Sequence, residues 1–397
     1  MKIFGAGIKV AILAFWPIAS AHNISVVDES SIVCGAERLD QYLSFLQGRR
    51  VGLIVNPTSR CGNRHLVDTL RSLGVKITKI FGPEHGYRGD QPAGAPVASY
   101  KDPATGITVV SLYGVKKKPT VKDLEDVDVL VFDIQDVGAR FYTYISTMSL
   151  CMEAAAEQGK KFLVLDRPNP NGYYVDGPVL ESACSSFVGM HPVPIVHGMT
   201  VGEYALMING EKWLRDGLVC DLTVIPCLQY THKSRYRLPI PPSPNLNTEE
   251  SVYLYPTLGL FEGTVMSVGR GTERPFTVVG HPRWAEAPVK FIPRPIAGMS
   301  DQPKYSGQEC RGYDLSAYAL HFLKEQGRIE LFWIIEAYRK IGGDFFTPYF
   351  DKLAGTPKLR EQIQAAVPEA EIRRSWQEDL IKFKSIRKKY LLYPDFE

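Results

Sequence analysis

The residues best suited to do chemistry are gathered in one short stretch, Lys79–Asp90, which reads KIFGPEHGYRGD. A carboxylic acid, an imidazole and a guanidinium, those of Glu84, His85 and Arg88, fall within five positions of it. Three glycines and a proline predict a tight loop rather than a helix or a strand. A glutamate held in such a loop beside apolar residues can have a raised pKa and serve as a proton donor. We therefore expect any catalysis by this chain to centre on Glu84.

Other acids are candidates for working with Glu84. Hydrolysis of a glycosidic bond needs one acid to protonate the leaving oxygen and a second group to attack or stabilise the anomeric carbon. Arg140 and Arg167 are candidates for holding a substrate carboxylate through two parallel hydrogen bonds, although each is otherwise an ordinary salt-bridge partner. The acids that follow apolar runs or sit between glycines are Asp133, Asp136, Asp166 and Glu262.

Short apolar runs predict the strands that would position these groups, with helical patterns over Arg64–Leu73 and Phe141–Gln158 between them. The alternation predicts an α/β fold with a Rossmann-like parallel sheet and helices on both faces. Parallel strands joined by right-handed connections end along one edge, where such sheets bind ligands. The predicted strands are Arg50–Val55, Val75–Phe81, Thr108–Leu112, Val127–Phe132 and Lys161–Leu165, followed by Val193–His197 and Leu222–Ile225 around a helix at Val201–Leu214.

Polar side chains gather at the ends of those strands. Several loops that carry acids, amides and guanidiniums on one edge indicate a binding site, whereas a single polar residue indicates only a solvated loop. Solvated loops without a function are the alternative explanation of the whole pattern. The strand-end residues are Asn56, Glu84, Tyr113, Asp133, Gln135, Asp136, Asp166 and Arg167.

The pattern changes at a segment rich in proline and asparagine, Leu238–Asn247, which should be extended and irregular. We place a domain boundary there, with residues 22–240 as the Rossmann-like catalytic domain and residues 241–397 as a smaller mixed α+β domain. Short strands are expected near Phe291 and at Gly312–Leu315. Helices are expected at Ala317–Gln326, Leu331–Lys340 and Glu371–Lys389.

The first 21 residues have the order of a secretory signal peptide: a basic start, a short apolar run and three small residues. We therefore expect the mature chain to begin at His22 and to be exported, either periplasmic or secreted. All seven cysteines follow this segment. Cys220 and Cys227 flank a predicted strand and could pair, but buried free thiols are the simpler expectation.

Composition and motifs exclude several classes of function. A net charge of +3 over 397 residues is too small to indicate nucleic-acid binding or an obligate membrane surface. No Walker A, HExxH or CxxC sequence occurs, and the GRG at 269–271 is too short for a dinucleotide fingerprint. Gly198–Gly202 imitates a nucleophile elbow, but Thr200 with Glu203 forms a capping box instead. We expect no cofactor and no metal, although carboxylates from separate loops could assemble a divalent-ion site.

Six motifs of this chain together resemble one known family. They are GPEHGxRG at residues 82–89, FDIQDVGxRFYTY at 132–144, LDRPNP at 165–170, PSPN at 242–245, GRGT at 269–272 and FDKLAG at 350–355. Over Leu39–Tyr393 the chain is similar to the NamZ-type exo-β-N-acetylmuramidases, formerly a family of unknown function. The resemblance implies a Rossmann-like domain, a smaller C-terminal domain and an active site in the cleft between them. It also implies release of N-acetylmuramic acid from the non-reducing ends of peptidoglycan fragments, with Glu84 as the catalytic glutamate.

Roles follow from the residues and the resemblance together. Glu84 would be the general acid, assisted by His85. The second group is either an aspartate such as Asp136 or the sugar's own 2-acetamido oxygen, oriented by an aspartate. The lactyl carboxylate of muramic acid calls for an arginine, with Arg88, Arg140 and Arg270 as candidates. The proline-rich segment and residues 262–272 are expected to wall the pocket. The expected substrate contacts are Asn56, Arg88, Asp133, Gln135, Arg140, Tyr142, Asp166, Arg167, Asn245, Glu262 and Arg270.

Two other functions fit the same residues. A non-catalytic protein that binds peptidoglycan fragments would use the same cleft without turnover. A metal-dependent hydrolase would lose its activity to a strong chelator. The partners expected of the enzyme and of the binding protein are muramic-acid saccharides, without nucleic acid and without integral membrane association.

Overall fold

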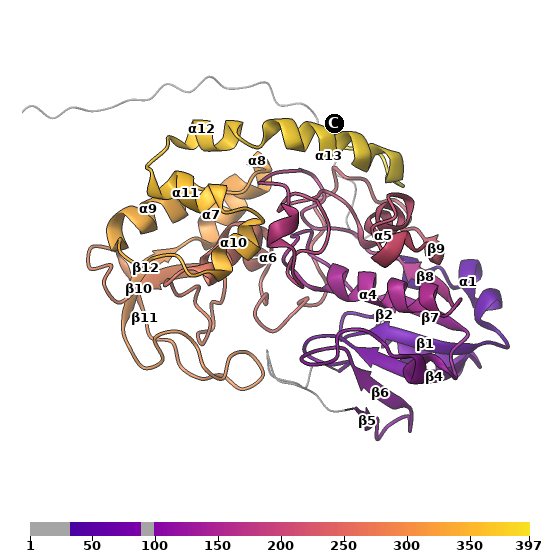
Figure 1. The fold of residues 1–397 in the computed structure, drawn as a ribbon. Coiled ribbons are helices and arrows are strands. Elements are labelled where there is room, and N and C mark those ends of the chain that lie inside the picture. Colours follow the sequence, from indigo (N-terminus) through magenta and orange to yellow (C-terminus); the bar gives the residue numbers. More distant parts are fainter. Residues whose placement is uncertain (1–31, 89–98) are drawn as a thin grey trace, which may run out of the picture.

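The computed structural model describes residues 32–88 and 99–397 of the chain. The predicted signal peptide, residues 1–21, and the last two residues of the stretch at 79–90 lie outside the described residues. Figure 1 shows the strands of the N-terminal half (indigo to magenta) on one side of the molecule and most of the C-terminal half (orange to yellow) on the other.

A seven-stranded sheet forms the centre of the N-terminal half. Its strands run in the order β5-β6-β4-β1-β7-β8-β9, and each is parallel to its neighbours except the edge strand β5. Without β5 this is the Rossmann strand order, with the topological switch point between β1 and β7. The predicted α/β class is confirmed. The strands are β1 (Arg50–Val55), β4 (Lys76–Gly82), β5 (Tyr100–Lys101), β6 (Thr108–Ser111), β7 (Val129–Asp133), β8 (Lys161–Leu165) and β9 (Asp221–Ile225).

Helices cover both faces of this sheet because successive strand residues point to opposite sides. In β7, Val129 and Val131 belong to the core beneath α1 and α2, whereas Leu130 and Phe132 belong to the core beneath α4 and α5. The central strands β1, β7 and β8 therefore read as nearly continuous apolar runs, as buried parallel strands do, whereas β4 and β9 carry polar residues at exposed or half-buried positions. The helices of this half are α1 (Leu39–Leu46), α2 (Leu66–Ser72), α3 (Val121–Leu124), α4 (Tyr144–Glu157) and α5 (Val201–Gly210), and a ribbon of β2 (Arg60–Cys61) and β3 (Arg64–His65) precedes α2.

The C-terminal half is built on a three-stranded antiparallel sheet, β10-β12-β11, with helices around it, which confirms its mixed α+β class. Among the described residues, no helix has both the length and the apolar character needed to cross a bilayer. The elements are β10 (Val278–His281), β11 (Val289–Phe291), β12 (Cys310–Asp314), α6 (Glu249–Leu258), α7 (Ser316–Tyr318), α8 (Lys324–Gln326), α9 (Phe332–Ile341), α10 (Tyr349–Ala354), α11 (Lys358–Gln364), α12 (Glu369–Arg374) and α13 (Gln377–Arg387).

Some predicted elements are wrong. The segment Val193–His197 makes only isolated bridges, both through Val196, and is not a strand. Prolines at positions 192 and 194 cannot donate to a sheet ladder, which explains the difference. The helix predicted over Glu371–Lys389 is broken between α12 and α13. The sequence pattern also missed β10 and α6, the latter because Pro256 lies inside it.

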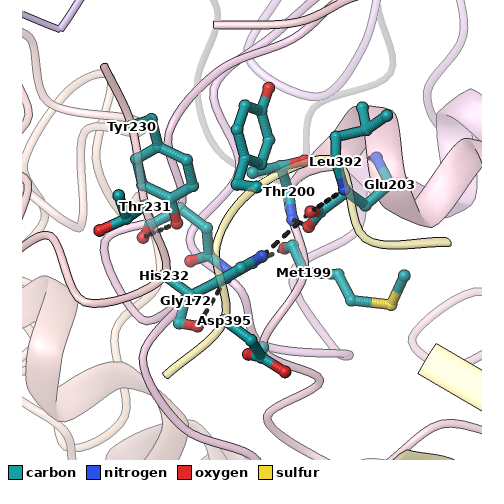
Figure 2. Close-up of polar contacts among 12 residues, drawn as sticks. Gly172, Met199, Thr200, Glu203, Tyr230, Thr231, His232, Leu392 and Asp395 are labelled. Carbon is teal, nitrogen blue, oxygen red and sulfur yellow. Dashed lines mark hydrogen bonds and ion pairs between the residues drawn. The ribbon is translucent and has the colours of Figure 1, made fainter. Parts of the chain in front are cut away.

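The end of the chain returns to the N-terminal half. α12 and α13 cross the top of the molecule as drawn in Figure 1 and reach the region of α5. There the buried guanidinium of Arg387 donates to the Gly198 carbonyl and pairs with Asp395 at 2.8 Å. Figure 2 shows the neighbouring network, in which the Glu203 carboxylate accepts the Leu392 N–H at 2.8 Å and contacts His232 at 3.0 Å. These contacts fasten the C-terminus beside α5.

Candidate active site

A cavity of about 960 Å³ is lined by side chains of both halves. The proline-rich segment and residues 262–270 form part of its wall, as predicted. The other walls come from the ends of β4 and β6, from α10 and from the segment before α4. The predicted site residues that the cavity brings together are Glu84, His85, Tyr142, Asn245, Glu262 and Arg270.

The predicted catalytic loop begins where β4 ends at Gly82, whose carbonyl accepts the N–H of the residue after β6 at 2.8 Å. A tight turn follows, closed by a hydrogen bond of 3.0 Å from the Gly86 N–H to the Pro83 carbonyl. Within it His85 has a φ of 68°, a left-handed conformation that costs a residue with a side chain about 1–2 kcal/mol. This strained turn carries Glu84 and His85 to the cavity.

Tyrosine hydroxyls surround Glu84. Tyr113, which follows β6, hydrogen-bonds to the Glu84 carboxyl group; burial and the charge of Glu84 together raise the pKa of this tyrosine above its ordinary value. Burial and nearby carboxylates, including Glu84, likewise raise the pKa of Tyr144 and Tyr349. These hydroxyls therefore stay protonated; Tyr113 bonds to the Glu84 carboxyl group, whereas the Tyr144 hydroxyl donates to the Pro242 carbonyl at 3.4 Å. Tyr349, from α10, was not predicted; a content of 20 tyrosines was the only sequence signal for such a wall.

An ion pair from the C-terminal half lines the same cavity. Arg270 Nε lies 2.8 Å from Glu262 Oε1, and the guanidinium carbon lies 4.9 Å from the centre of the Phe276 ring. Burial alone would lower the pKa of Arg270, but the Glu262 carboxylate raises it above the ordinary value, so the guanidinium stays charged. The described residues engage only its Nε in a hydrogen bond. Its Nη donors can therefore bind a carboxylate in the cavity.

Two lysines that the sequence reasoning missed add positive charge to the wall. Lys117 Nζ lies 4.4 Å from the centre of the Phe187 ring, and Lys352 donates to the Ala183 carbonyl at 3.2 Å. Lys352 belongs to the FDKLAG motif, which was the available signal for it. Lys117 lies in a run of lysines and carries no signal of its own.

Asn245 presents an acceptor that the protein leaves unused. Its side-chain amide donates to the Met299 carbonyl at 2.7 Å, which fixes its orientation. Its Oδ1 is buried and has no hydrogen-bond partner within the described part of the chain. A buried polar atom without a partner is costly. We therefore expect Oδ1 to accept a hydrogen bond from a ligand in the cavity.

Asp133 and Arg167, both predicted to bind substrate, bind each other in the interior. The distances are 2.5 Å from Nε to Oδ1 and 2.9 Å from Nη2 to Oδ2. The side chains are 0% and 6% exposed. Burial alone would lower the pKa of Arg167, but the Asp133 carboxylate raises it, so the guanidinium stays charged. Neither residue lines the cavity, so this structure does not show the predicted substrate contacts.

Asn56, Gln135 and Asp166 do not line the cavity either, although Asn56 hydrogen-bonds to Tyr144, which does. Asn56 accepts the backbone N–H two residues further on at 2.9 Å, and Gln135 donates to a proline carbonyl after β8 at 2.7 Å. Asp166 accepts the Thr200 hydroxyl and the Gly202 N–H, each at 2.8 Å, and so holds the start of α5. These three side chains position strand ends rather than line the site.

Of the three arginines predicted for the lactyl carboxylate, only Arg270 reaches the cavity. Arg140 is fully buried and donates to three backbone carbonyls at 2.7 to 2.9 Å, one of them in α10. Arg88 pairs with Asp102 at 3.2 Å and lines a separate cavity of about 850 Å³. The geometry therefore supports Arg270 alone among them.

Asp136, predicted as a second catalytic group, does not line the cavity. Its Oδ1 accepts the Gly138 N–H at 2.7 Å, and its buried Oδ2 has no hydrogen-bond partner in the residues described. Burial raises its pKa to about 7. Its charge acts on Tyr142 and Tyr144, which do line the cavity, so it lies close behind them. In this structure Asp136 is separated from the cavity and does not contact a ligand there directly.

The Asp136→Asn variant should gain stability relative to the wild type as the pH rises. A raised pKa in the folded state means that the protonated carboxyl group stabilises the fold below about pH 4. This contribution is lost as the pH rises through about 7. An amide cannot ionise, so the difference in Tm should move in favour of the variant between about pH 5 and pH 8. Thermal unfolding across that range checks this, and a constant difference would contradict it.

The acids that line the cavity are Glu84, Glu262 and Asp301, the last of which was not predicted. Within residues 32–88 and 99–397, no three histidine, cysteine, aspartate or glutamate side chains are grouped as metal ligands would be. The cavity thus offers Glu84 on a strained loop, Glu262 in an ion pair, Asp301, tyrosine hydroxyls and three cations. This set suits protonation of a leaving oxygen together with recognition of a carboxylate.

Known proteins are similar to this chain in sequence and in fold. The family model described as the N-terminal part of the exo-β-N-acetylmuramidase NamZ matches residues 51–250, and its C-terminal counterpart matches residues 253–393. The peptidoglycan β-N-acetylmuramidase NamZ of Bacillus subtilis is 40% identical over 380 residues, 89% of each chain. Two crystal structures of DUF1343 family proteins from Bacteroides fragilis are similar, with TM-scores of 0.85 and 0.79 at 45% and 33% identity. They cover 92% and 91% of this chain, and 99% of each of theirs is covered. With both halves matched in order, the chain belongs to the NamZ exo-β-N-acetylmuramidase family.

Proposed function

We propose that this protein releases N-acetylmuramic acid from the non-reducing ends of peptidoglycan fragments, with Glu84 as the general acid. Membership of the family makes it a glycosidase. The role of Glu84 as general acid is supported by its position on a strained turn. There it lines a cavity together with tyrosine hydroxyls and Arg270.

In this reaction Glu84 gives its proton to the glycosidic oxygen as the bond to the anomeric carbon breaks. The Tyr113 hydroxyl holds the carboxyl group and donates to the carboxylate that remains. The sugar's own 2-acetamido oxygen attacks the anomeric carbon, and Asn245 Oδ1 orients that group by accepting its N–H. Water then opens the resulting ring and returns a proton to Glu84, which now acts as the base.

A direct assay tests the proposal with a chromogenic β-N-acetylmuraminide and the matching β-N-acetylglucosaminide. Turnover of the muraminide supports the enzyme. Turnover of neither, with peptidoglycan fragments still bound, would favour the non-catalytic binding protein. A parallel assay with a strong chelator addresses the metal-dependent alternative, which requires activity to disappear.

The Arg270→Met variant should lose about 10- to 100-fold in kcat/KM on the muraminide, because a hydrogen bond between charged groups contributes about 1.5–3 kcal/mol. Most of the loss should appear in KM, and the preference for the muraminide over the glucosaminide should disappear. The matched control is Arg274→Met, which removes a partly exposed arginine paired with Asp314 outside the cavity. An equal loss of kcat/KM on both sugars would show that Arg270 does not bind the lactyl carboxylate.

We also propose that the protein acts outside the cytoplasm. The support is the order of basic, apolar and small residues over the first 21 positions and a substrate that belongs to the cell wall. The first residue of the protein recovered from the periplasm or the medium should be His22. Retention in the cytoplasm with the first 21 residues intact would contradict the proposal.

A further inference from the structure

We propose that Cys34 and Cys227 form a disulfide bond, which fastens the segment that leads into the domain to the loop after β9. The inference does not depend on the proposed reaction. It rests on the backbone register between the two segments and on the placement of the two thiols.

The register brings the two cysteines face to face. Val33 and Leu228 form an isolated antiparallel bridge, with N–H to carbonyl distances of 3.2 and 2.9 Å in the two directions. The next directly opposed pair is therefore Cys34 with Cys227, at a position without ladder hydrogen bonds. Such pairs have Cα atoms about 4.5 Å apart, within the roughly 4.4–6.8 Å that a disulfide bond spans.

The two thiols lie side by side in the interior. Each residue is 5% exposed. The Cys227 thiol donates to the Asp166 carbonyl at 3.2 Å, and the Cys34 sulfur lies 4.0 Å from the Tyr236 hydroxyl. A hydrogen bond with Cys227 lowers the pKa of Cys34 in spite of burial, and the charge of Arg167 acts in the same direction. In the folded protein the Cys34 thiol therefore ionises more readily than the Cys227 thiol, whose pKa burial raises.

The reaction is a thiol–disulfide exchange with a small or protein-borne disulfide as the oxidant. The Cys34 thiolate attacks one sulfur of the oxidant, and the oxidant's other sulfur leaves as a thiolate. The Cys227 thiolate then attacks the Cys34 sulfur and expels the second half of the oxidant. Two protein thiols become one disulfide, two protons are released to the departing thiolates, and the oxidant is reduced to two thiols. Because both sulfurs are buried in the folded protein, the exchange takes place during folding, and the same products result when Cys227 attacks first.

The pairing of Cys220 with Cys227, which the sequence allowed, is wrong. These residues flank β9 and are seven positions apart. An extended chain of that length spans about 23 Å, whereas a disulfide bond requires Cα atoms closer than about 7 Å. Cys151 is buried inside α4, and burial is the single cause that raises its pKa, which indicates no thiol beside it. The register therefore selects Cys34 as the partner of Cys227.

Peptide mapping tests the inference on the mature chain. One sample is recovered after export and another is refolded with reduced and oxidised glutathione, and free thiols are alkylated in denaturant before digestion. The expected result is five alkylated cysteines out of seven and one crosslinked pair of peptides that contain positions 34 and 227. Seven alkylated cysteines in both samples, or a crosslink to another cysteine such as Cys61, would overturn the proposal.

Thermal unfolding provides a second readout, with variants that keep the fold. A reductant should lower the Tm of the wild type by roughly 3–8 °C, and should have no effect on Cys34→Ala or Cys227→Ala. Cys220→Ala, a buried cysteine outside the pair, is the matched control and should respond to the reductant as the wild type does. A reductant response that persists in Cys34→Ala would also overturn the proposal. Turnover of the muraminide should be the same with and without reductant, which separates this test from that of the proposed function.

Discussion

The Glu84→Gln variant is expected to cleave a muramic-acid disaccharide about 10²–10⁴-fold more slowly than the wild type, the range that a positioned general acid usually contributes. Glutamine keeps the size of the side chain and its hydrogen bond to Tyr113, but it cannot release a proton to the glycosidic oxygen. Binding of the disaccharide should therefore be retained while kcat falls. Steady-state kinetics together with calorimetric titration of the variant separate these two quantities.

A comparison of substrates with different leaving groups shows whether Glu84 acts as a proton donor. A nitrophenolate leaves readily without protonation, so Glu84→Gln should lose much less activity on a nitrophenyl muraminide than on the disaccharide. Glu309→Gln, a half-exposed carboxylate of the C-terminal half that does not line the cavity, is the control and should behave as the wild type does. Equal losses on the two substrates would assign Glu84 to substrate positioning rather than to proton donation.

Local sequence features located the catalytic loop but not every side chain around it. Gly82, Pro83 and Gly86 indicate a turn directly after a predicted strand. The position of Glu84 at the edge of the sheet could therefore be inferred from the sequence. The Tyr349 and Lys352 side chains come from α10, more than 200 residues away in sequence. Which distant element closes a cavity depends on how two halves pack, and no local pattern records that.

Several residues at the strand ends do not line the cavity, for a related physical reason. The sequence pattern placed Asp133, Asp136, Asp166 and Arg167 on the correct edge of the sheet. It could not tell whether an acid at that edge faces the cavity or a neighbouring strand end. Asp133 pairs with the guanidinium of Arg167 in the loop after β8, and Asp166 accepts hydrogen bonds from the N-terminus of α5. Both interactions join loops about 34 residues apart, so only the tertiary structure shows them.

The fold itself was predictable where burial alone decides it. The central strands β1, β7 and β8 are almost wholly apolar because both faces of the sheet are covered there, and every strand of the parallel sheet was found within two residues of its bounds. The elements β10 and α6 are buried as well, but β10 is only four residues long and Pro256 interrupts the helical pattern of α6. At Val193–His197 the apolar pattern was present, but the prolines remove the donors that a ladder needs.

The second large effect is expected at the buried ion pair, where Asp133→Ala should destabilise the protein by about 3–5 kcal/mol. The variant leaves the Arg167 guanidinium charged and 6% exposed, without its carboxylate partner. The midpoint of chemical denaturation should fall accordingly. If Asp133 instead contacts substrate, as its strand-end position suggested, the outcome should differ. The KM of the variant, measured at a temperature where it is fully folded, should then rise, and the midpoint of chemical denaturation should hardly change.

Two further variants show whether the loss at Asp133 comes from an unpaired buried charge. Asp221→Ala removes a carboxylate from an exposed pair with Lys161 on the same sheet, and should cost less than about 1 kcal/mol. The double variant Asp133→Leu with Arg167→Met replaces both charges with apolar groups of similar volume, so it should recover most of the stability lost by Asp133→Ala. Arg167 also donates to the Arg60 carbonyl at 3.0 Å, so a small deficit should remain. If the double variant does not recover stability, the loss in Asp133→Ala does not come from an unpaired buried charge. It would then come from a change in the packing of the strand ends.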